Sequence, residues 1–257
     1  MRKVEGLFLM FSAAGSIIIL ILLIPMILAP LMTTPSQLAD ALADPEILGA
    51  LSVTFSAATM ATILALAFGV PLAYVMARKE FAFKGLLESI LNIPLTIPHS
   101  VAGILVLLAY HSRTGIGSIL SNLGIVIEDT LWGITLAMLF VSSPILISSA
   151  KAGFSMIDES LEHVARTLGA SHYKTFLTVS LPLSLRAIAS GAILTWTRSV
   201  SEVGALLIVA PYPRSIALLV IQRFEAFGLS SALPITVILL GISLIIVLVM
   251  THILKGG

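Results

Sequence analysis

Long apolar runs, separated by short polar segments, are the main pattern of the sequence. A helix that crosses a lipid bilayer needs about 20 mostly apolar residues, because lipid offers the backbone no hydrogen-bond partner. Six runs reach this length, so we predict six transmembrane helices. Their predicted bounds are 7–31, 47–77, 86–110, 131–150, 183–210 and 233–254.

The composition agrees with this pattern and excludes a soluble fold. Of the 257 residues, 58% are hydrophobic and only 11% are charged, and the mean hydropathy is +1.10. Soluble domains are roughly half apolar and a quarter charged. We therefore predict an all-α polytopic membrane protein. The net charge of +1 carries little information in a membrane protein, and no nucleic-acid partner is implied. The absence of Cys and the scatter of the five His predict no disulfide, metal site or cofactor.

The positive charges are distributed unevenly between the two sides of the membrane. Cytoplasmic loops carry an excess of Lys and Arg. With six spans, ten of these residues fall on one side and three on the other. The ten are Arg2, Lys3, Arg78, Lys79, Lys84, Lys151, Arg166, Lys174, Arg186 and Lys255, and the three are Arg113, Arg214 and Arg223. This asymmetry predicts cytoplasmic N and C termini, with the acidic residues Asp40, Asp44 and Glu46 outside.

The third predicted span contains two prolines close to its start, Pro94 and Pro98, followed by His99. Each Pro removes a backbone donor and clashes with the preceding turn, so we expect a kink or an unwound stretch. Broken backbone at membrane depth occurs where protein or a water-filled cavity covers it. The span is thus a candidate for lining a pathway, and a kinked packing helix or re-entrant segment is the alternative.

The loop 151–182 has helical patterning and is too polar to cross the membrane. Asp158 is placed to cap a short amphipathic helix, and Gly169 is placed to end it. A second short helix is predicted from Ser171, before Pro182 opens the fifth span. On pattern alone the loop either lies in the membrane interface or contacts a partner. The segment 215–232, on the other side, is predicted to be an interfacial helix.

The fifth predicted span contains a polar stretch, Trp196-Thr197-Arg198-Ser199-Val200-Ser201-Glu202. Arg198 and Glu202 are four residues apart and therefore share a helix face. Ionisable side chains within a membrane require a partner or water. A structural ion pair that orients helices or joins subunits is one interpretation, and a role of Arg198 in drawing an anion along a pathway is the other.

Nucleotide-binding and hydrolase motifs are absent from the sequence. No Gly-Lys dipeptide occurs, so there is no Gly-x-x-x-x-Gly-Lys phosphate-binding loop, and His-Glu-x-x-His and Gly-x-Ser-x-Gly are also missing. We predict no catalytic residues, which argues against an intramembrane hydrolase. A carrier driven by an ion gradient remains an alternative, because Glu202 could relay a proton.

Within the loop, Glu162-His163-Val164-Ala165-Arg166-Thr167-Leu168-Gly169-Ala170-Ser171, followed by Val179-Ser180-Leu181-Pro182, resembles the EAA loop of type I ABC importer permeases. His163 replaces the usual Glu and Val164 the first Ala, whereas Ala165 keeps the second. In that family the loop couples the permease to a separate ATPase. The resemblance implies that coupling residues here are Asp158, Glu162, His163, Ala165, Arg166, Gly169 and Ser171.

The resemblance covers about 50–254 and is closest to the molybdate and tungstate permeases, particularly archaeal ones. It is carried by motifs at 68–79, 97–104, 140–142 and 198–205. It implies a type I importer permease fold with a core at 47–254, after a first helix and external loop at 1–46. The implied pathway or gate residues are Pro94, Pro98, His99, Thr197, Arg198, Ser199, Ser201 and Glu202. A homodimer, a cytoplasmic ATPase and an external oxyanion-binding protein, which would dock outside, are the implied partners, and sulfate is the alternative cargo.

Overall fold

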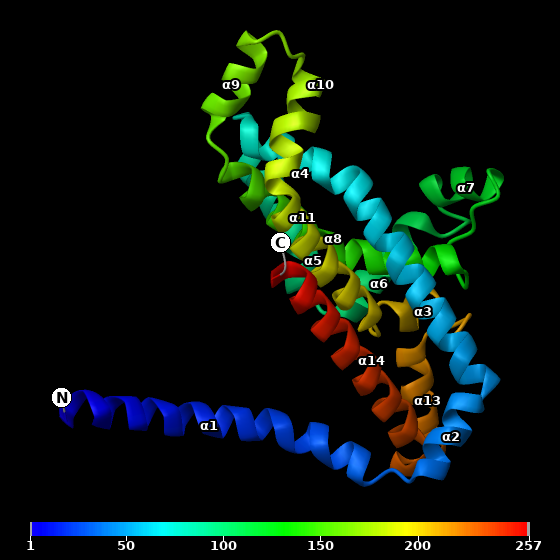
Figure 1. Cartoon of the computed structure of the whole chain (residues 1–257). Helices are drawn as coiled ribbons and strands as arrows, with labels where there is room; N and C mark the ends of the chain where they lie inside the picture. Colours follow the sequence, from blue (N-terminus) through cyan, green and yellow to red (C-terminus); the bar gives the residue numbers. More distant parts are fainter. Residues whose placement is uncertain (1, 256–257) are drawn as a thin grey trace. The chain divides into compact units, whose positions relative to one another are not determined.

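The computed structural model describes residues 2–255, and the side chains of residues 8–249. All regular elements of the described residues are helices. They are α1 (Arg2–Leu31), α2 (Pro35–Ala43), α3 (Pro45–Leu64), η1 (Ala65–Gly69), α4 (Val70–Arg78), α5 (Lys84–Thr96), α6 (His99–Tyr110), α7 (Gly115–Asn122), α8 (Leu131–Ser155), α9 (Glu159–Thr167), α10 (His172–Thr175), η2 (Phe176–Ser180), α11 (Leu181–Val200), α12 (Leu206–Val209), α13 (Ile216–Phe227) and α14 (Leu229–Lys255) (Figure 1).

The prediction of six spans is confirmed. Five helices are long and apolar enough to cross a membrane, over Phe8–Leu31, Pro45–Arg78, Leu131–Ser155, His172–Val200 and Leu229–Val249. The bent pair α5 and α6, whose axes differ by 117°, passes the same test together and makes the sixth span when it is counted as one. The break falls at Ile97–Pro98, where the two prolines predicted it. Pro98 caps α6, and Pro94 is buried inside α5.

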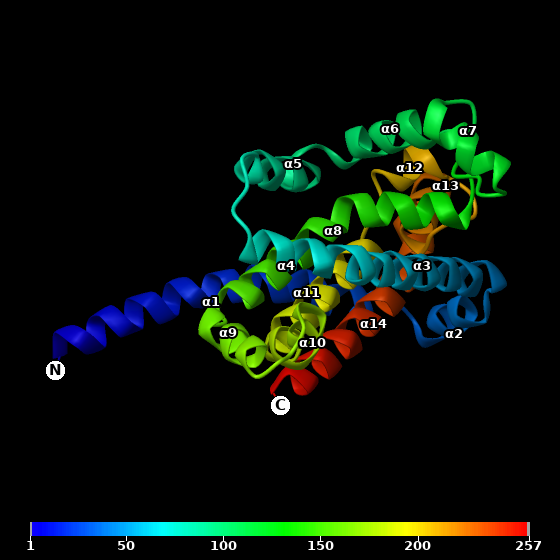
Figure 2. The ribbon, with the colours of Figure 1, turned by 90° about the horizontal axis from the view of Figure 1, so that it is seen from above.

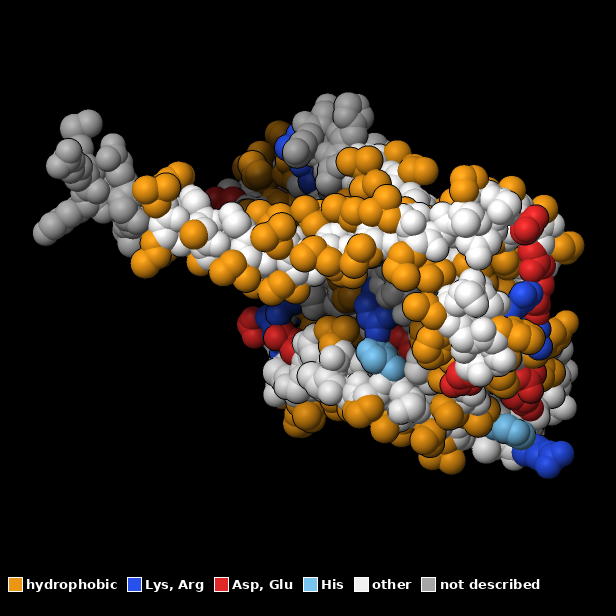
Figure 3. Space-filling model, turned by 90° about the horizontal axis from the view of Figure 1, so that it is seen from below, with side chains coloured by type: hydrophobic (Ala, Val, Ile, Leu, Met, Phe, Trp, Pro, Cys, Tyr) orange, Lys and Arg blue, Asp and Glu red, His pale blue; other side chains and the backbone are white. Residues whose placement is uncertain are grey.

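The fold divides into two compact units. One contains the chain up to Leu48 together with Val220–His252, and the other contains Gly49–Leu219. In the first unit, α1 exposes its apolar side chains from Phe8 to Leu31, and the orange side chains in Figure 3 show them. Arg223 of α13 forms ion pairs with Asp44 and Glu46, at 3.0 and 2.5 Å. The Glu46 and Asp44 carboxylates raise the pKa of the Arg223 guanidinium above its ordinary value, because their effect outweighs desolvation by burial, which lowers it.

The second unit is built around α8. Helices α5 and α6 run along one side of α8, and α11 runs along another (Figure 2). The α8–α11 contact is close because glycines remove side chains from it. A Cβ on Gly191 would lie 2.7 Å from Cβ of Ser149, and one on Gly153 would lie 2.5 Å from Cβ of Ala187. Small residues of this kind allow membrane helices to approach each other.

The fifth span differs from its predicted bounds at both ends. We expected a separate short helix before Pro182, but α10, η2 and α11 form one helix from His172 to Val200. The π-helical turn Phe176–Ser180 precedes Pro182, as Ala65–Gly69 precedes Pro71. A wider turn accommodates a residue that has no N–H and whose ring crowds the preceding carbonyl. Helix α11 also ends ten residues earlier than predicted, so Glu202 lies in the following turn.

The predicted interfacial helix at 215–232 is two elements. Helix α13 ends at Phe227, Gly228 follows with φ +77°, and α14 begins at Leu229. A left-handed residue of this kind ends a helix. The sixth span therefore begins four residues before its predicted start.

Candidate functional site

The loop after α8 contains the predicted short helix, α9, with defined caps at both ends. Asp158 Oδ1 accepts a hydrogen bond from the backbone N–H of Ser160 at 2.9 Å. This bond lowers the pKa of the Asp158 carboxyl below its ordinary value. At the other end Gly169 has φ +92°, and Ala170 N–H donates to the carbonyl of Ala165 at 3.0 Å. This Schellman arrangement fits the Gly position that the sequence predicted as the helix end.

One side of this loop is an apolar surface in contact with solvent. We call it the apolar knob, and it consists of Met156, Leu161, Val164 and Leu168. Leu168 is 83% exposed and Val164 is 57% exposed. A helix that merely closed a loop would turn such residues inward. An exposed apolar patch beside polar residues is typical of a protein or membrane contact.

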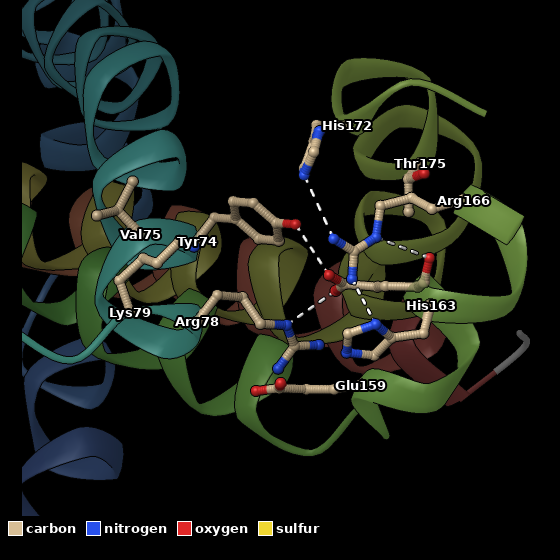
Figure 4. Close-up of a pocket in the computed structure, with 10 residues that line it drawn as sticks. Tyr74, Val75, Arg78, Lys79, Glu159, His163, Arg166, His172 and Thr175 are labelled. Atoms are coloured by element: carbon tan, nitrogen blue, oxygen red, sulfur yellow. Dashed lines mark hydrogen bonds and ion pairs between the residues drawn. The ribbon is translucent and has the colours of Figure 1, made fainter. Parts of the chain in front are cut away.

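Glu162 lies on the opposite, inner side of α9. Its Oε1 accepts hydrogen bonds from Arg78 Nε and Ser180 Oγ, both at 2.8 Å, and its Oε2 accepts one from Tyr74 OH at 3.0 Å. Arg78 also donates to the carbonyl of Ile157 at 3.2 Å. The donors come from α4 and η2, so one carboxylate joins the loop to the second and fifth spans. Figure 4 shows the two donors of α4, Tyr74 and Arg78.

The surroundings keep Glu162 ionised. Burial disfavours the charged carboxylate, but hydrogen bonds from Arg78, Ser180 and Tyr74 outweigh it and lower the pKa of Glu162 below its ordinary value. The Tyr74 ring packs against Phe154 and Phe176, with centroids 5.2 and 4.9 Å away. Glu162 therefore faces the second and fifth spans, because both of its carboxylate oxygens accept hydrogen bonds from them.

Arg166 does not pair with the Glu162 carboxylate, although the two residues are one helical turn apart. Its Nε donates to the Glu162 backbone carbonyl at 3.3 Å, and its terminal nitrogens lie 2.7 Å from His163 Nδ1 and 3.3 Å from His172 Nε2. These side chains line a pocket of about 270 Å³. Its other lining residues are Tyr74, Val75, Arg78, Lys79, Glu159, Glu162 and Thr175 (Figure 4).

A second polar cluster forms where two spans are interrupted, and it contains His99, Arg198 and Glu202. Arg198 Nη2 lies 2.9 Å from Glu202 Oε2 and 2.8 Å from each ring nitrogen of His99. His99 Nδ1 lies 3.0 Å from the same Glu202 oxygen. Glu202 is almost fully buried, and its Oε1 accepts from the backbone N–H of Ala205 at 2.8 Å. An Arg left unpaired in lipid would cost roughly 2.5–3.5 kcal/mol on insertion scales, so the pairing stabilises this span.

The packing around His99 is tight. A Cβ on Gly204 would lie 2.7 Å from Cβ of His99, and one on Gly103 would lie 2.7 Å from the carbonyl oxygen of Ala205. Glycine at both positions therefore permits the start of α6 to contact the turn that follows α11. The helix break at Pro98 in the third span therefore packs against the end of the fifth span after Val200.

The remaining predicted pathway residues separate into two groups. Thr197 and Ser201 are exposed, and their hydroxyls donate to carbonyls of α11. Ser199 is buried and donates to Ser142 Oγ of α8 at 2.9 Å, so it joins two helices and is not on the exposed side of α11. Pro94 is buried within α5 and Pro98 caps α6, so both shape the backbone near the cluster.

Sequence reasoning missed Tyr74, Arg78 and Ser180 as partners of Glu162. Arg78 was counted only as a positive charge at the end of a span, and Tyr74 lies one helical turn before it. A Tyr and an Arg on one helix face at the end of a span are a usable signal. The pattern alone does not say which carboxylate of the loop they bind. Among the described residues, no group of His, Asp or Glu side chains is arranged to hold a metal ion.

The chain matches the family model described as "Binding-protein-dependent transport system inner membrane component" over residues 69–256. It is 45% identical over 239 residues to the molybdate/tungstate transport system permease protein of Pyrococcus abyssi. The match covers 91% of this chain and 90% of that relative. It is 36% identical over 217 residues to a probable sulfate transport system permease protein of Nephroselmis olivacea. This match covers 83% of this chain and 76% of the relative.

Among solved structures, the fold resembles a bacterial ABC transporter involved in the import of the acidic polysaccharide alginate. The TM-score is 0.75 at 16% sequence identity, and the match covers 99% of this chain and 97% of that one. This likeness supports the fold assignment alone. The family model matches well over half of the chain. The protein is a multi-pass membrane protein that belongs to the family of binding-protein-dependent transport system inner membrane components.

Proposed function

We propose that the chain is the permease subunit of an ATP-driven importer for molybdate or tungstate. The observation that carries this proposal is the 45% identity to the molybdate/tungstate permease over nearly the full length of both chains. The sulfate permease is a more distant relative at 36% identity, which favours the larger oxyanions as cargo.

The energy would come from a separate cytoplasmic ATPase bound at the loop between the fourth and fifth spans. The sequence has no phosphate-binding loop of its own. The apolar knob, with Val164 and Leu168, suits insertion into a groove of a partner. The bonds from Glu162 to Arg78 and Ser180 would carry a displacement of the knob into two spans. Of the proposed coupling residues, Glu162 binds the second and fifth spans. The ends of the loop helices are fixed by Asp158, Ala165, Gly169 and Ser171. The polar side of the loop contains His163 and Arg166.

The complete importer would contain two copies of this chain and an external oxyanion-binding protein. Both termini and the loop would be cytoplasmic, as the distribution of Lys and Arg favours. The pathway would pass the cluster of His99, Arg198 and Glu202. Exposing these charged side chains to lipid would cost free energy, and water or a second subunit on their exposed side would avoid that cost. Glu202 already accepts hydrogen bonds from Arg198 and from the backbone N–H of Ala205, and His99 Nδ1 lies 3.0 Å from it. These contacts disfavour the alternative of a proton-relaying carrier.

Reconstitution tests the proposal. The chain is co-expressed with an ATPase subunit and an oxyanion-binding protein from the same organism, and the complex is placed in proteoliposomes. We expect ATP-dependent accumulation of tungstate and molybdate, with little competition from a tenfold excess of sulfate. Uptake without ATP that follows an ion gradient would contradict the importer, and sulfate uptake as efficient as tungstate uptake would contradict the cargo.

A further inference from the structure

The His99–Arg198–Glu202 cluster contains more donor capacity than its own carboxylate uses. Arg198 has five N–H donors, which can bind an oxyanion through two parallel bonds. Its Nη2 is bound by Glu202 and His99, and its Nη1 lies 3.3 Å from Ser201 Oγ. Among the described residues, its Nε has no acceptor.

Burial within the cluster is uneven. The Glu202 side chain is 1% exposed, whereas those of Arg198 and His99 are 25% and 40% exposed. The acidic group is therefore covered by the chain itself, and the two groups that can donate to an anion are the accessible ones. The hydroxyl residues Thr197, near the end of α11, and Ser201, directly after it, are also exposed.

From this arrangement we infer that Arg198 and His99 form a transient binding site for a tetrahedral oxyanion, with Glu202 as its resident competitor. The inference rests on the proposed function and names the residues that would touch the cargo. Glu202 Oε2 is the one oxygen bound by both Arg198 and His99. An incoming oxyanion binds the same two donors, and the carboxylate beside them keeps that binding weak. Weak binding suits transport, because an anion that is held tightly leaves slowly.

This arrangement predicts effects of opposite sign for neighbouring residues. Removing a donor, as in Arg198→Gln or His99→Ala, weakens oxyanion binding. Removing the competing charge in Glu202→Gln strengthens it, because repulsion between the carboxylate and the oxyanion disappears. If the cluster were purely structural, all three substitutions would change oxyanion binding in the same direction.

The test uses the permease purified with its ATPase in detergent, without the binding protein, and tungstate as the probe. Bound tungsten is measured by equilibrium dialysis followed by elemental analysis, at concentrations up to the millimolar range. We expect Arg198→Gln and His99→Ala to raise the dissociation constant about tenfold, the loss of one charge-assisted hydrogen bond. Glu202→Gln should lower it at least about threefold and also slow ATP-driven uptake at saturating tungstate.

Arg186→Gln is the matched control, because Arg186 is exposed on the same helix and lies outside the cluster. Elution volume and retention of the ATPase establish that each variant is assembled. If Arg198→Gln does not assemble, Arg198→Lys keeps the charge near Glu202 and must still weaken binding, since an ammonium lacks the planar fork.

Three outcomes would overturn the inference. They are unchanged binding in the Arg198 and His99 variants, a shift of the Glu202→Gln variant in the same direction as the others, and no tungstate bound by the wild type up to millimolar concentration. The proposed function would still hold in each case if the wild type imports the oxyanion. A wild type that accumulates no oxyanion with ATP would instead contradict the proposed function itself.

Discussion

Arg78 Nε lies 2.8 Å from Glu162 Oε1, and the two side chains are only 8% and 9% exposed. The first belongs to the end of the second span and the second to the short helix of the loop between the fourth and fifth spans. Ser180 binds the same carboxylate oxygen from the start of the fifth span. The loop helix is thus attached to two spans through one buried anion, and its apolar knob projects from this fixed base.

We predict that Glu162→Ala detaches the loop helix. Removing one partner of a buried ion pair leaves an uncompensated charge on Arg78 and costs about 3–5 kcal/mol. We expect loss of hydrogen-exchange protection in α9 and hydrolysis of ATP without uptake. Glu159→Ala is the matched control, because Glu159 is exposed on the same helix. Equal effects of the two variants would contradict the prediction.

The anchoring should weaken in acid. Because the pKa of Glu162 is lower in the folded protein than its ordinary value of 4.5, its ionised form stabilises the fold. This contribution is complete above the ordinary pKa and is lost as the pH falls below 4.5 toward the lower folded pKa. Asp158, whose pKa is also lowered, acts in the same direction.

Hydrogen exchange in α9 measures this effect as a function of pH. We expect its opening free energy, after correction for intrinsic exchange rates, to fall below about pH 4.5 in the wild type. In Glu162→Gln the profile should be flatter, and only the part due to Asp158 should remain. A wild-type profile that matches that of Glu162→Gln would exclude Glu162 as the titrating group.

The spans and the loop helix could be predicted from sequence because their signals are local. Runs of apolar residues specify spans, and Asp158 and Gly169 specify helix ends through bonds to their own neighbours. The continuous helix through Pro182 could not be predicted, since a π-helical turn leaves no apolar pattern of its own. The end of α11 at Val200 was missed for a similar reason, because the sequence that follows it is still apolar.

The candidate site was predictable in part. The pairing of Arg198 with Glu202 follows from their spacing of four residues, and the structure has it. The contact of both with His99 depends on how two interrupted spans fold together, which spacing along one helix does not contain. The inward direction of Glu162 likewise depends on Arg78, which lies 84 residues earlier.

Gly169 should tolerate no side chain without loss of the loop geometry. Its φ of +92° is a conformation that residues with a Cβ rarely adopt, although nothing within 4 Å would obstruct that atom. We predict that Gly169→Ala destabilises the loop by about 1 kcal/mol and that the β-branched Gly169→Val does so by more. The measurement is hydrogen exchange of α9 together with ATP-coupled uptake. Gly115→Ala is the control, since Gly115 has no obstruction and no positive φ. An undisturbed Gly169→Val variant would refute the prediction.

The close approach of α8 and α11 should depend on Gly191. A Cβ there would lie 2.7 Å from Ser149 Cβ, so Gly191→Ala forces the helices apart, at a cost of about 1–3 kcal/mol. The second substitution Ser149→Gly removes the opposing atom and should recover most of this loss, giving a coupling energy in a double-mutant cycle. Gly241→Ala, where a Cβ meets nothing within 4 Å, should leave the melting temperature unchanged or raise it slightly. Thermal unfolding of the detergent-purified protein measures all four variants against the wild type. Additive effects of Gly191→Ala and Ser149→Gly would show that the two positions do not limit the helix distance.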